Sequence, residues 1–174
     1  MSDKESDLKQ LVIFSLAEES YGVDIGKVSG IERMQNITKV PRTNDSVVGV
    51  INLRGRVIPV VDLRKIFYLP LSEETKDTRI VVVDINGQPI GCLVDAVTEV
   101  LRIPADSVEP PSSVIGSGES EYLLGIAKLE NRMIILLDLD NALALDGTVA
   151  AVAEMEIPSI EELSEEVEQE KTAV

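Results

Sequence analysis

One stretch of the sequence occurs twice, and this internal repeat constrains the fold more than any other feature. Residues 49–63 align without a gap on residues 125–139 at a constant offset of 76. Each copy predicts a strand, a two-residue turn, a second strand and a helix start capped by aspartate. A weaker echo pairs residues 22–28 with residues 91–97 at an offset of 69. Two copies of one small β-unit are the simplest explanation. The identical pairs are Gly49/Gly125, Leu53/Leu129, Arg56/Arg132, Ile58/Ile134, Asp62/Asp138 and Leu63/Leu139.

The body of the chain, from Leu11 to about Leu145, holds short runs of valine, isoleucine and leucine bounded by turn residues. Asn86-Gly87 between two such runs is the clearest hairpin signal, because both residues tolerate positive φ. Helices are expected only near residues 62–67 and 139–145. This pattern predicts an all-β fold built as small barrels or a sandwich. The strands predicted directly from these runs are 11–16, 47–53, 56–61, 80–85 and 132–137.

Charge and composition exclude several classes of function. The chain has 16 Lys and Arg against 31 Asp and Glu, a formal net charge of −15, which repels nucleic acid and anionic lipid. It has no histidine and one cysteine, Cys92, so the common nucleophile pairs and a thiolate zinc site are missing. Three tyrosines, two phenylalanines and no tryptophan are too few for a base-stacking platform. We therefore expect no catalysis, no metal and no cofactor.

The two ends of the sequence differ from the body. Residues 1–10 are polar and predict a flexible N-terminus without the apolar core of a signal peptide. No apolar run is long enough to span a membrane, and the cysteine is unpaired, so we expect a cytoplasmic protein. Residues 147–174 contain eight glutamates and one basic residue, a net −7. We expect this acidic tail to be dispensable for folding.

A short helix within the tail is an alternative to a fraying, solubilising segment. Ser159 and Glu162 have the spacing of a capping box. Ile160, Leu163 and Val167 follow at helical spacing, which would form one apolar stripe. An isolated helix of this length is marginal in water, so the solubilising tail is the simpler interpretation.

The turn in the first copy of the repeat carries the strongest candidate for recognition. Arg54 and Arg56 flank Gly55, whereas the second copy has Glu130 at the position of Arg54. A planar side chain with five donors on a rigid hairpin suits recognition of a partner's carboxylate or backbone carbonyls. The alternative is an exposed turn residue that serves only solubility.

The sequence also resembles a known family. Tyr-Gly-Val-Asp-Ile at 21–25, Gly-Val-Ile-Asn-Leu-Arg-Gly at 49–55, Ile-Pro-Val-Val-Asp-Leu at 58–63 and the segment 91–97 closely resemble the CheW family, the bacterial chemotaxis coupling proteins. The resemblance covers about Leu11 to Leu145. It implies two five-stranded SH3-like barrels side by side within a domain at 11–146.

The function that the resemblance implies is that of a non-enzymatic adaptor. Such a protein couples the cytoplasmic tips of chemoreceptors to the regulatory domain of the histidine kinase CheA, in membrane-associated arrays. CheA's regulatory domain has the same fold, but this sequence carries no kinase or phosphotransfer domain, which favours a free-standing coupling protein. Coupling in another chemosensory system, such as twitching motility, is an alternative. An RNA-associated SH3-like module is a weaker one, because it would need a basic stripe.

The resemblance finally implies a receptor-binding groove between the barrels. Apolar residues in such a groove suit a partner helix that buries one stripe, whereas the alternative is that the valines belong to the core. Gly30 stands where the family often has glutamate, with Glu32 close by. Residues that face the kinase are not identified. The groove positions on this chain are Val28, Arg54, Ile80, Val97 and Val100, with Gly49, Asn52 and Gly55 supporting the hairpin.

Overall fold

The computed structural model describes residues 8–41, 45–110, 122–145 and 147–154, which form two sheets and a few short helices. The strands are β1 (Leu8–Leu16), β2 (Glu19–Asp24), β3 (Val28–Arg33), β4 (Val47–Leu53), β5 (Arg56–Asp62), β6 (Arg79–Ile85), β7 (Gln88–Val94), β8 (Ala96–Pro104), β9 (Val108–Glu109), β10 (Leu123–Leu129) and β11 (Arg132–Leu137). The helices are η1 (Ile25–Lys27), α2 (Leu63–Ile66), η2 (Ala105–Ser107), α3 (Leu139–Leu145) and α4 (Thr148–Glu154).

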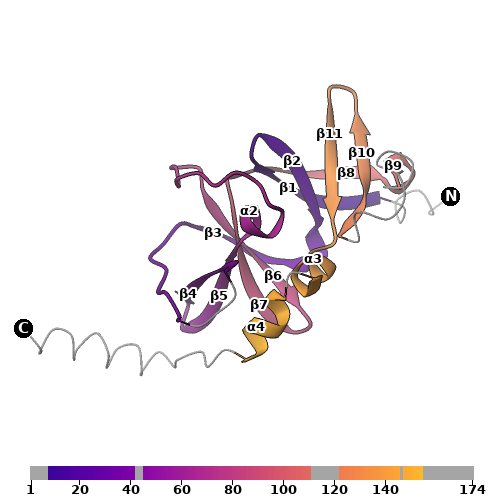
Figure 1. The fold of residues 1–174 in the computed structure, drawn as a ribbon. Coiled ribbons are helices and arrows are strands. Elements are labelled where there is room, and N and C mark those ends of the chain that lie inside the picture. Colours follow the sequence, from indigo (N-terminus) through magenta and orange to yellow (C-terminus); the bar gives the residue numbers. More distant parts are fainter. Residues whose placement is uncertain (1–7, 42–44, 111–121, 146, 155–174) are drawn as a thin grey trace, which may run out of the picture.

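The predicted all-β fold is confirmed. A six-stranded sheet has the order β8-β1-β2-β11-β10-β9, and a five-stranded sheet has the order β3-β6-β7-β5-β4. In Figure 1 the six-stranded sheet lies at the upper right and the five-stranded sheet at the lower left. The sixth strand, β9, has only two residues, and it extends the five strands expected for one of the barrels.

The two copies of the sequence repeat form the same order of elements, a hairpin followed by the start of a helix. Residues 49–63 lie in the hairpin β4–β5 and the start of α2, and residues 125–139 lie in the hairpin β10–β11 and the start of α3. Asp62 Oδ1 accepts a hydrogen bond from the backbone N–H of Arg64 at 2.9 Å, which caps α2. Asp138 Oδ1 accepts a hydrogen bond from the backbone N–H of Asn141 at 3.2 Å, so the repeated aspartate bonds to the first turn of the helix in both copies.

Each sheet contains strands from both halves of the chain. The hairpin β1–β2 belongs to the six-stranded sheet with β8 to β11, and the hairpin β6–β7 belongs to the five-stranded sheet with β3 to β5. Each hairpin thus joins strands of the other half of the chain. On one side it does so through a parallel pairing, β2 with β11 and β7 with β5. At the offsets of the repeat, the order β8-β1-β2-β11-β10 corresponds strand for strand to β3-β6-β7-β5-β4. The halves are thus interleaved.

The repeated glycine is explained by a close approach at one edge of each sheet. Thr38 and Val50 exchange two backbone hydrogen bonds of 2.8 Å beside Gly49. A Cβ on Gly49 would lie 2.2 Å from the carbonyl oxygen of Thr38, and one on Gly125 would lie 2.7 Å from that of Glu109 in β9. Only glycine leaves room for these neighbouring backbones.

Three clusters of buried side chains hold the fold together. A central core draws residues from both sheets, for example Phe14 and Leu16 from β1 and Val81 and Val83 from β6. A second cluster lies within the six-stranded sheet, and a third lies within the five-stranded sheet. Each strand such as β1 or β6 therefore buries both faces, one toward its own sheet's cluster and one toward the central core.

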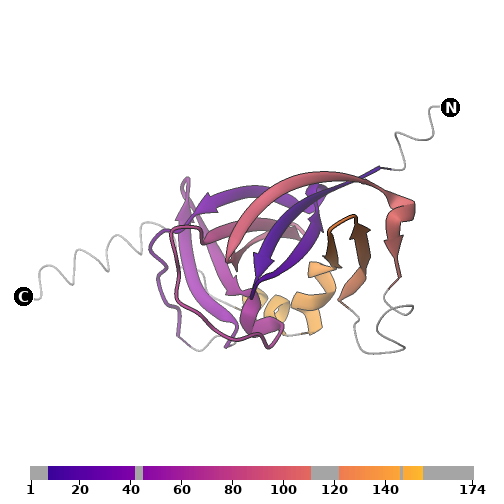
Figure 2. The ribbon, with the colours of Figure 1, turned by 90° about the horizontal axis from the view of Figure 1, so that it is seen from above.

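The start of the acidic tail is more structured than the sequence predicted. α4 packs beside α3, and its residues Thr148 and Val152 are buried while Val149 packs against the central core. Figure 2 shows both C-terminal helices together on one side of the molecule. This burial indicates that residues 148–154 add stability, so the expectation of a tail dispensable from residue 147 stays a prediction for truncation to test. The predicted apolar stripe at Ile160, Leu163 and Val167 lies outside the described residues.

Candidate functional site

Three of the predicted groove valines lie on the edge strands of the two sheets. Val28 begins β3, and Val97 and Val100 lie on β8. Val28 and Val97 are half-buried against the central core, whereas Val100 is 51% exposed. Val28 and Val97 are also equivalent at the offset of 69, so the two sheets present the same position at their edges.

A further apolar residue belongs with these valines, and sequence reasoning missed it. Ile31 on β3 is equivalent to Val100 on β8, and it is 42% exposed. In the β3–β6 register it lies opposite Val81, whose side chain is in the central core. Continuing the weaker repeat by three residues would have indicated it. Val28, Ile31, Val97 and Val100 are called the apolar strip below.

Ile80 does not lie with the apolar strip. Its side chain is fully buried and packs in the cluster of the five-stranded sheet with Ile51 and Ile58. Because successive side chains of a strand point to opposite faces, Ile80 lies on the face of β6 opposite to Val81. In this conformation Ile80 is a core residue that a partner cannot touch.

The hairpin β4–β5 presents Arg54 at its tip. Arg54 and Gly55 have φ values of 50° and 87°, and Asn52 Oδ1 accepts a hydrogen bond of 3.0 Å from the backbone N–H of Gly55. The Arg54 side chain is 82% exposed, and its Nη2 lies 3.3 Å from Glu32 Oε1. Glu32 thus supplies a carboxylate near the hairpin although Gly30 lacks one. An exposed pair of this kind is weak, so the guanidinium remains available to a partner.

The turn in the second copy has a different backbone. Among the non-glycine residues of the described ranges, positive φ occurs at Arg54 but at neither Glu130 nor Asn131. The glutamate at position 130 is therefore no evidence that glutamate can replace Arg54 in the first turn. Glu18 in the β1–β2 turn is such evidence, because it has a φ of 71°.

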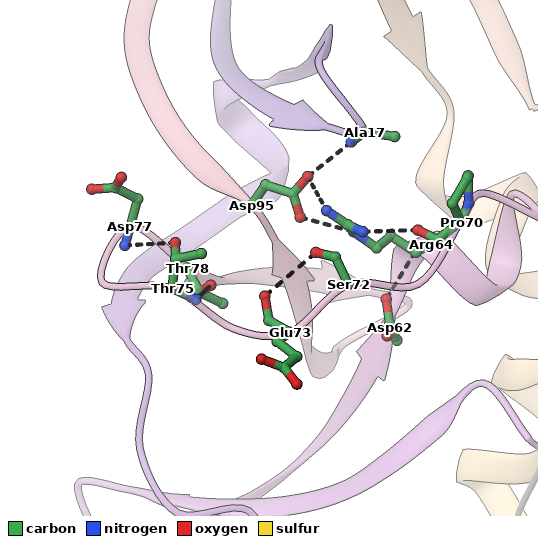
Figure 3. Close-up of polar contacts among 10 residues, drawn as sticks. All are labelled: Ala17, Asp62, Arg64, Pro70, Ser72, Glu73, Thr75, Asp77, Thr78 and Asp95. Carbon is green, nitrogen blue, oxygen red and sulfur yellow. Dashed lines mark hydrogen bonds and ion pairs between the residues drawn. The ribbon is translucent and has the colours of Figure 1, made fainter.

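An ion pair at the connection between β7 and β8 links α2 to the β1–β2 turn (Figure 3). Asp95, the residue between β7 and β8, accepts from Arg64 Nε at 2.8 Å and from the backbone N–H of Ala17 at 2.8 Å, and it also pairs with Arg64 Nη2. Arg64 Nη1 donates to the carbonyl oxygen of Pro70 at 2.8 Å. Since Val97 follows two residues after Asp95, this contact fixes the start of β8.

The equivalent connection in the other half carries an ion pair of opposite polarity. Asp140, at the position of Arg64 in the repeat, accepts from Lys27 Nζ at 2.7 Å. This hydrogen bond raises the pKa of Lys27 above its ordinary value. The pair lines a cavity of about 700 Å³ whose rim also holds Asp24, Asp84 and Asp138. Both ion pairs are contacts within the fold.

The acidic side chains and the one thiol are the groups that metal or thiol chemistry would need. No group of three or more Cys, Asp or Glu side chains in the described ranges is placed to hold a metal ion. Cys92 is fully buried in the central core, and burial raises the pKa of its thiol to about 12. None of the helices in the part of the chain that the structure describes is long and apolar enough to cross a membrane. Ile31, Val100 and Arg54 are exposed, which suits binding, as are other apolar residues such as Tyr68 and Met133.

Comparisons with known proteins give one family. The family model described as "CheW-like domain" matches residues 10–146. The chemotaxis protein CheW of Klebsiella aerogenes is 34% identical over 136 residues, which are 78% of this chain and 82% of that protein. CheW of Bacillus subtilis is 31% identical over 144 residues, 83% of this chain and 92% of that protein. The crystal structure of the scaffolding protein TtCheW from Thermoanaerobacter tengcongensis has a TM-score of 0.71 and 40% identity, covering 87% of this chain and 97% of that one.

Proposed function

The chain belongs to the CheW family of chemotaxis proteins, and on that basis we propose that it is a non-enzymatic adaptor that couples the cytoplasmic tips of chemoreceptors to the regulatory domain of a CheA-type histidine kinase. It would act in the cytoplasm, recruited to the membrane-associated receptor arrays. Coupling within another chemosensory system would use the same surfaces with a different receptor and kinase.

The observation that carries the proposal is an exposed arginine at a hairpin tip that contacts Glu32 on β3, the strand that also carries Val28 and Ile31. Arg54 stands at the tip of a hairpin fixed by Asn52 and Gly55, with most of its side chain in solvent. The apolar strip continues the central core to the surface along β3 and β8. We expect a receptor helix to bury one apolar stripe against the strip and to present a carboxylate or carbonyl to Arg54.

The test is to replace Arg54 by glutamate and to measure both partners side by side. The variant should fold, because the turn accepts glutamate and exposed substitutions usually change stability by about 0.5 kcal/mol. Its binding to a receptor fragment should become weaker by about 2–5 kcal/mol of binding free energy. The charge-assisted hydrogen bonds are lost, and the new glutamate repels the partner's negative group. Its affinity for the kinase regulatory domain should change much less.

Arg56→Glu is the matched control, since it makes the same charge change two residues away on the same hairpin. It should weaken receptor binding only slightly. Equal losses in the two variants would mean that net charge, and not Arg54, governs binding. Unchanged binding of Arg54→Glu to a receptor that the wild type binds would reject the hairpin as the recognition site.

A further inference from the structure

Two arginines stand directly opposite each other on neighbouring strands at the end of the five-stranded sheet. Arg33 on β3 pairs with Arg79 on β6 in the antiparallel register. Like charges in directly opposed positions destabilise a sheet. Both residues line a hollow of about 760 Å³ together with Met34 and Lys76. The fold alone therefore gives no reason for this arrangement, which is called the arginine pair below.

The two guanidinium groups differ in how they are held. Arg79 Nη1 donates to the carbonyl oxygens of Lys76 at 2.8 Å and Thr78 at 2.9 Å, so this side chain is anchored by backbone. Arg33 is exposed, and within the described ranges its guanidinium has no hydrogen-bonding or ion-pair partner. Glu74 and Asp77 also line the hollow, yet neither forms an ion pair with Arg33, Arg79 or Lys76 in these ranges. The pair therefore retains free donors.

The second half of the chain provides an internal comparison. At the offset of 69, Arg33 corresponds to Arg102 on β8, and Arg79 corresponds to Gln10 on β1. Gln10 lies opposite Arg102 in the register, and its amide oxygen, once the amide is oriented to match, accepts from Arg102 Nε at 2.9 Å and Nη2 at 3.3 Å. The same sheet position is thus satisfied by glutamine. An arginine at position 79 replaces an acceptor by a second positive charge.

We propose that the arginine pair, with Lys76 beside it, is a carboxylate-binding site for an acidic segment of the chain's protein partner. Two guanidinium groups on adjacent strands offer planar donors that match carboxylate geometry, and one of them is already held in place. A bound carboxylate would also remove the repulsion between the arginines. The chain has a net charge of −15, so most of its surface repels acidic groups. This local cluster of basic side chains would attract them instead.

The occupant is placed by continuity with the apolar strip, so this inference rests on the proposed function. Ile31 and Arg33 are on the same face of β3, opposite Val81 and Arg79 of β6. A receptor helix that covers Val28 and Ile31 and continues along β3 reaches the arginine pair. We therefore assign the site to one or two carboxylates at the end of the receptor helix's apolar stripe.

The experiment uses Arg79→Gln, which gives the five-stranded sheet the pairing already present at Gln10 and Arg102. The melting temperature should stay within a few degrees of wild type, because a like-charge pair is removed. Affinity for a receptor fragment should fall about tenfold at low salt, and the dependence of affinity on salt should become weaker. Arg33→Gln should behave alike. Lys128→Gln, which removes one exposed charge from the six-stranded sheet, is the matched control and should bind as wild type.

A second measurement does not need the receptor. Hexaglutamate peptide added to the full chain should shift the backbone NMR signals of Arg33 and Arg79, and Arg79→Gln should abolish these shifts. Shifts in wild type without any receptor binding would reject the proposed function and leave the carboxylate site standing. No shifts, or equal receptor affinity of wild type and Arg79→Gln, would overturn the inference. A shift seen only in a chain ending at Glu154 would assign the site to the chain's own acidic tail instead.

Discussion

At the scale of single residues, burial controls the chemistry of the one thiol. Cys92 is fully buried, and its pKa is raised from 9.0 to about 12 by desolvation. At pH 8 the thiolate fraction should be about a thousandfold lower in the folded than in the unfolded chain. We expect iodoacetamide to modify Cys92 at pH 8 only after denaturant unfolds the protein. Rapid modification of the native chain would show that β7 opens readily.

The same group makes stability depend on alkaline pH. The folded state holds the thiol proton more tightly than the unfolded state, so the stabilisation present below pH 9 is lost as pH rises toward 12. The free energy of unfolding should fall by about 1.4 kcal/mol between pH 8 and pH 10 from this group. Burial also raises the pKa of Tyr21. Cys92→Ala isolates the thiol, and an unchanged pH slope in that variant would contradict the assignment.

Residue-level prediction from sequence succeeded where the signal was local and failed where it depended on which face is buried. Asn86-Gly87 forms the β6–β7 turn with positive φ at both residues, as its turn chemistry requires. Ile80 and Ile31 are both isoleucines in strands, yet one is in a core and the other is at the surface. Ile31 lies on the edge strand β3 and Ile80 on the inner strand β6, and a single sequence does not display this order of strands.

At the scale of secondary-structure elements, the edge of the five-stranded sheet depends on Gly49. Its φ is 157°, and an added methyl group would collide with the backbone of Thr38. Gly49→Ala should break the Thr38–Val50 bridge and destabilise the protein by about 2–4 kcal/mol in urea unfolding. Gly55→Ala is the control, because nothing lies within 4 Å of its added Cβ and only the positive φ of 87° is unfavourable. It should lose about 1 kcal/mol. Equal losses would mean that the bridge is irrelevant.

The C-terminal helix α4 makes a second prediction at this scale. A chain ending at Glu154 keeps the buried residues Thr148 and Val152, and its melting temperature should match that of the full chain. A chain ending at residue 147 exposes apolar surface worth roughly 2–3 kcal/mol and should melt about 5–10 °C lower. Equal melting temperatures for the two truncated chains would show that α4 does not contribute. A loss already at Glu154 would show that the remaining tail packs on the domain.

Apolar runs in the sequence predicted four strands closely, whereas the half-polar edge strands were not predicted. β4, β5, β6 and β11 begin and end within one residue of the predicted runs. The edge strands β3 and β8 alternate exposed and half-buried positions, and β3 contains serine, glycine and glutamate. Such strands lack a continuous apolar run, so their periodicity is too weak to see. These two strands carry the apolar strip, and the part of the site that could be read from sequence came from the family resemblance.

At the scale of the whole molecule, the repeat predicted two similar units but not the exchange between them. Each sheet takes one hairpin from the other half of the chain. A repeat makes the two possible partners of each hairpin nearly equivalent in sequence, so local patterns cannot choose between them. The choice depends on the connections: a single residue, Asp95, joins β7 to β8 across the sheets, and η1 joins β2 to β3.

This interleaving predicts that neither half of the chain folds alone. A cut between Glu74 and Thr75, in the exposed segment 71–77, gives one fragment with β1 to β5 and another with β6 to β11. Each fragment lacks the hairpin that its own sheet needs and leaves half of the central core exposed. Circular dichroism should show neither native strand content nor cooperative unfolding for either fragment.

Mixed in equal amounts, the two fragments should regain both native strand content and cooperative unfolding. The melting temperature should then rise with concentration, because association is now required. Asp95→Asn in the second fragment should weaken reassembly, since it removes a charge that bonds to Arg64 and Ala17 of the first. If either fragment unfolds cooperatively on its own, each hairpin has paired with the sheet strands of its own half, and the exchange is not needed for a stable core.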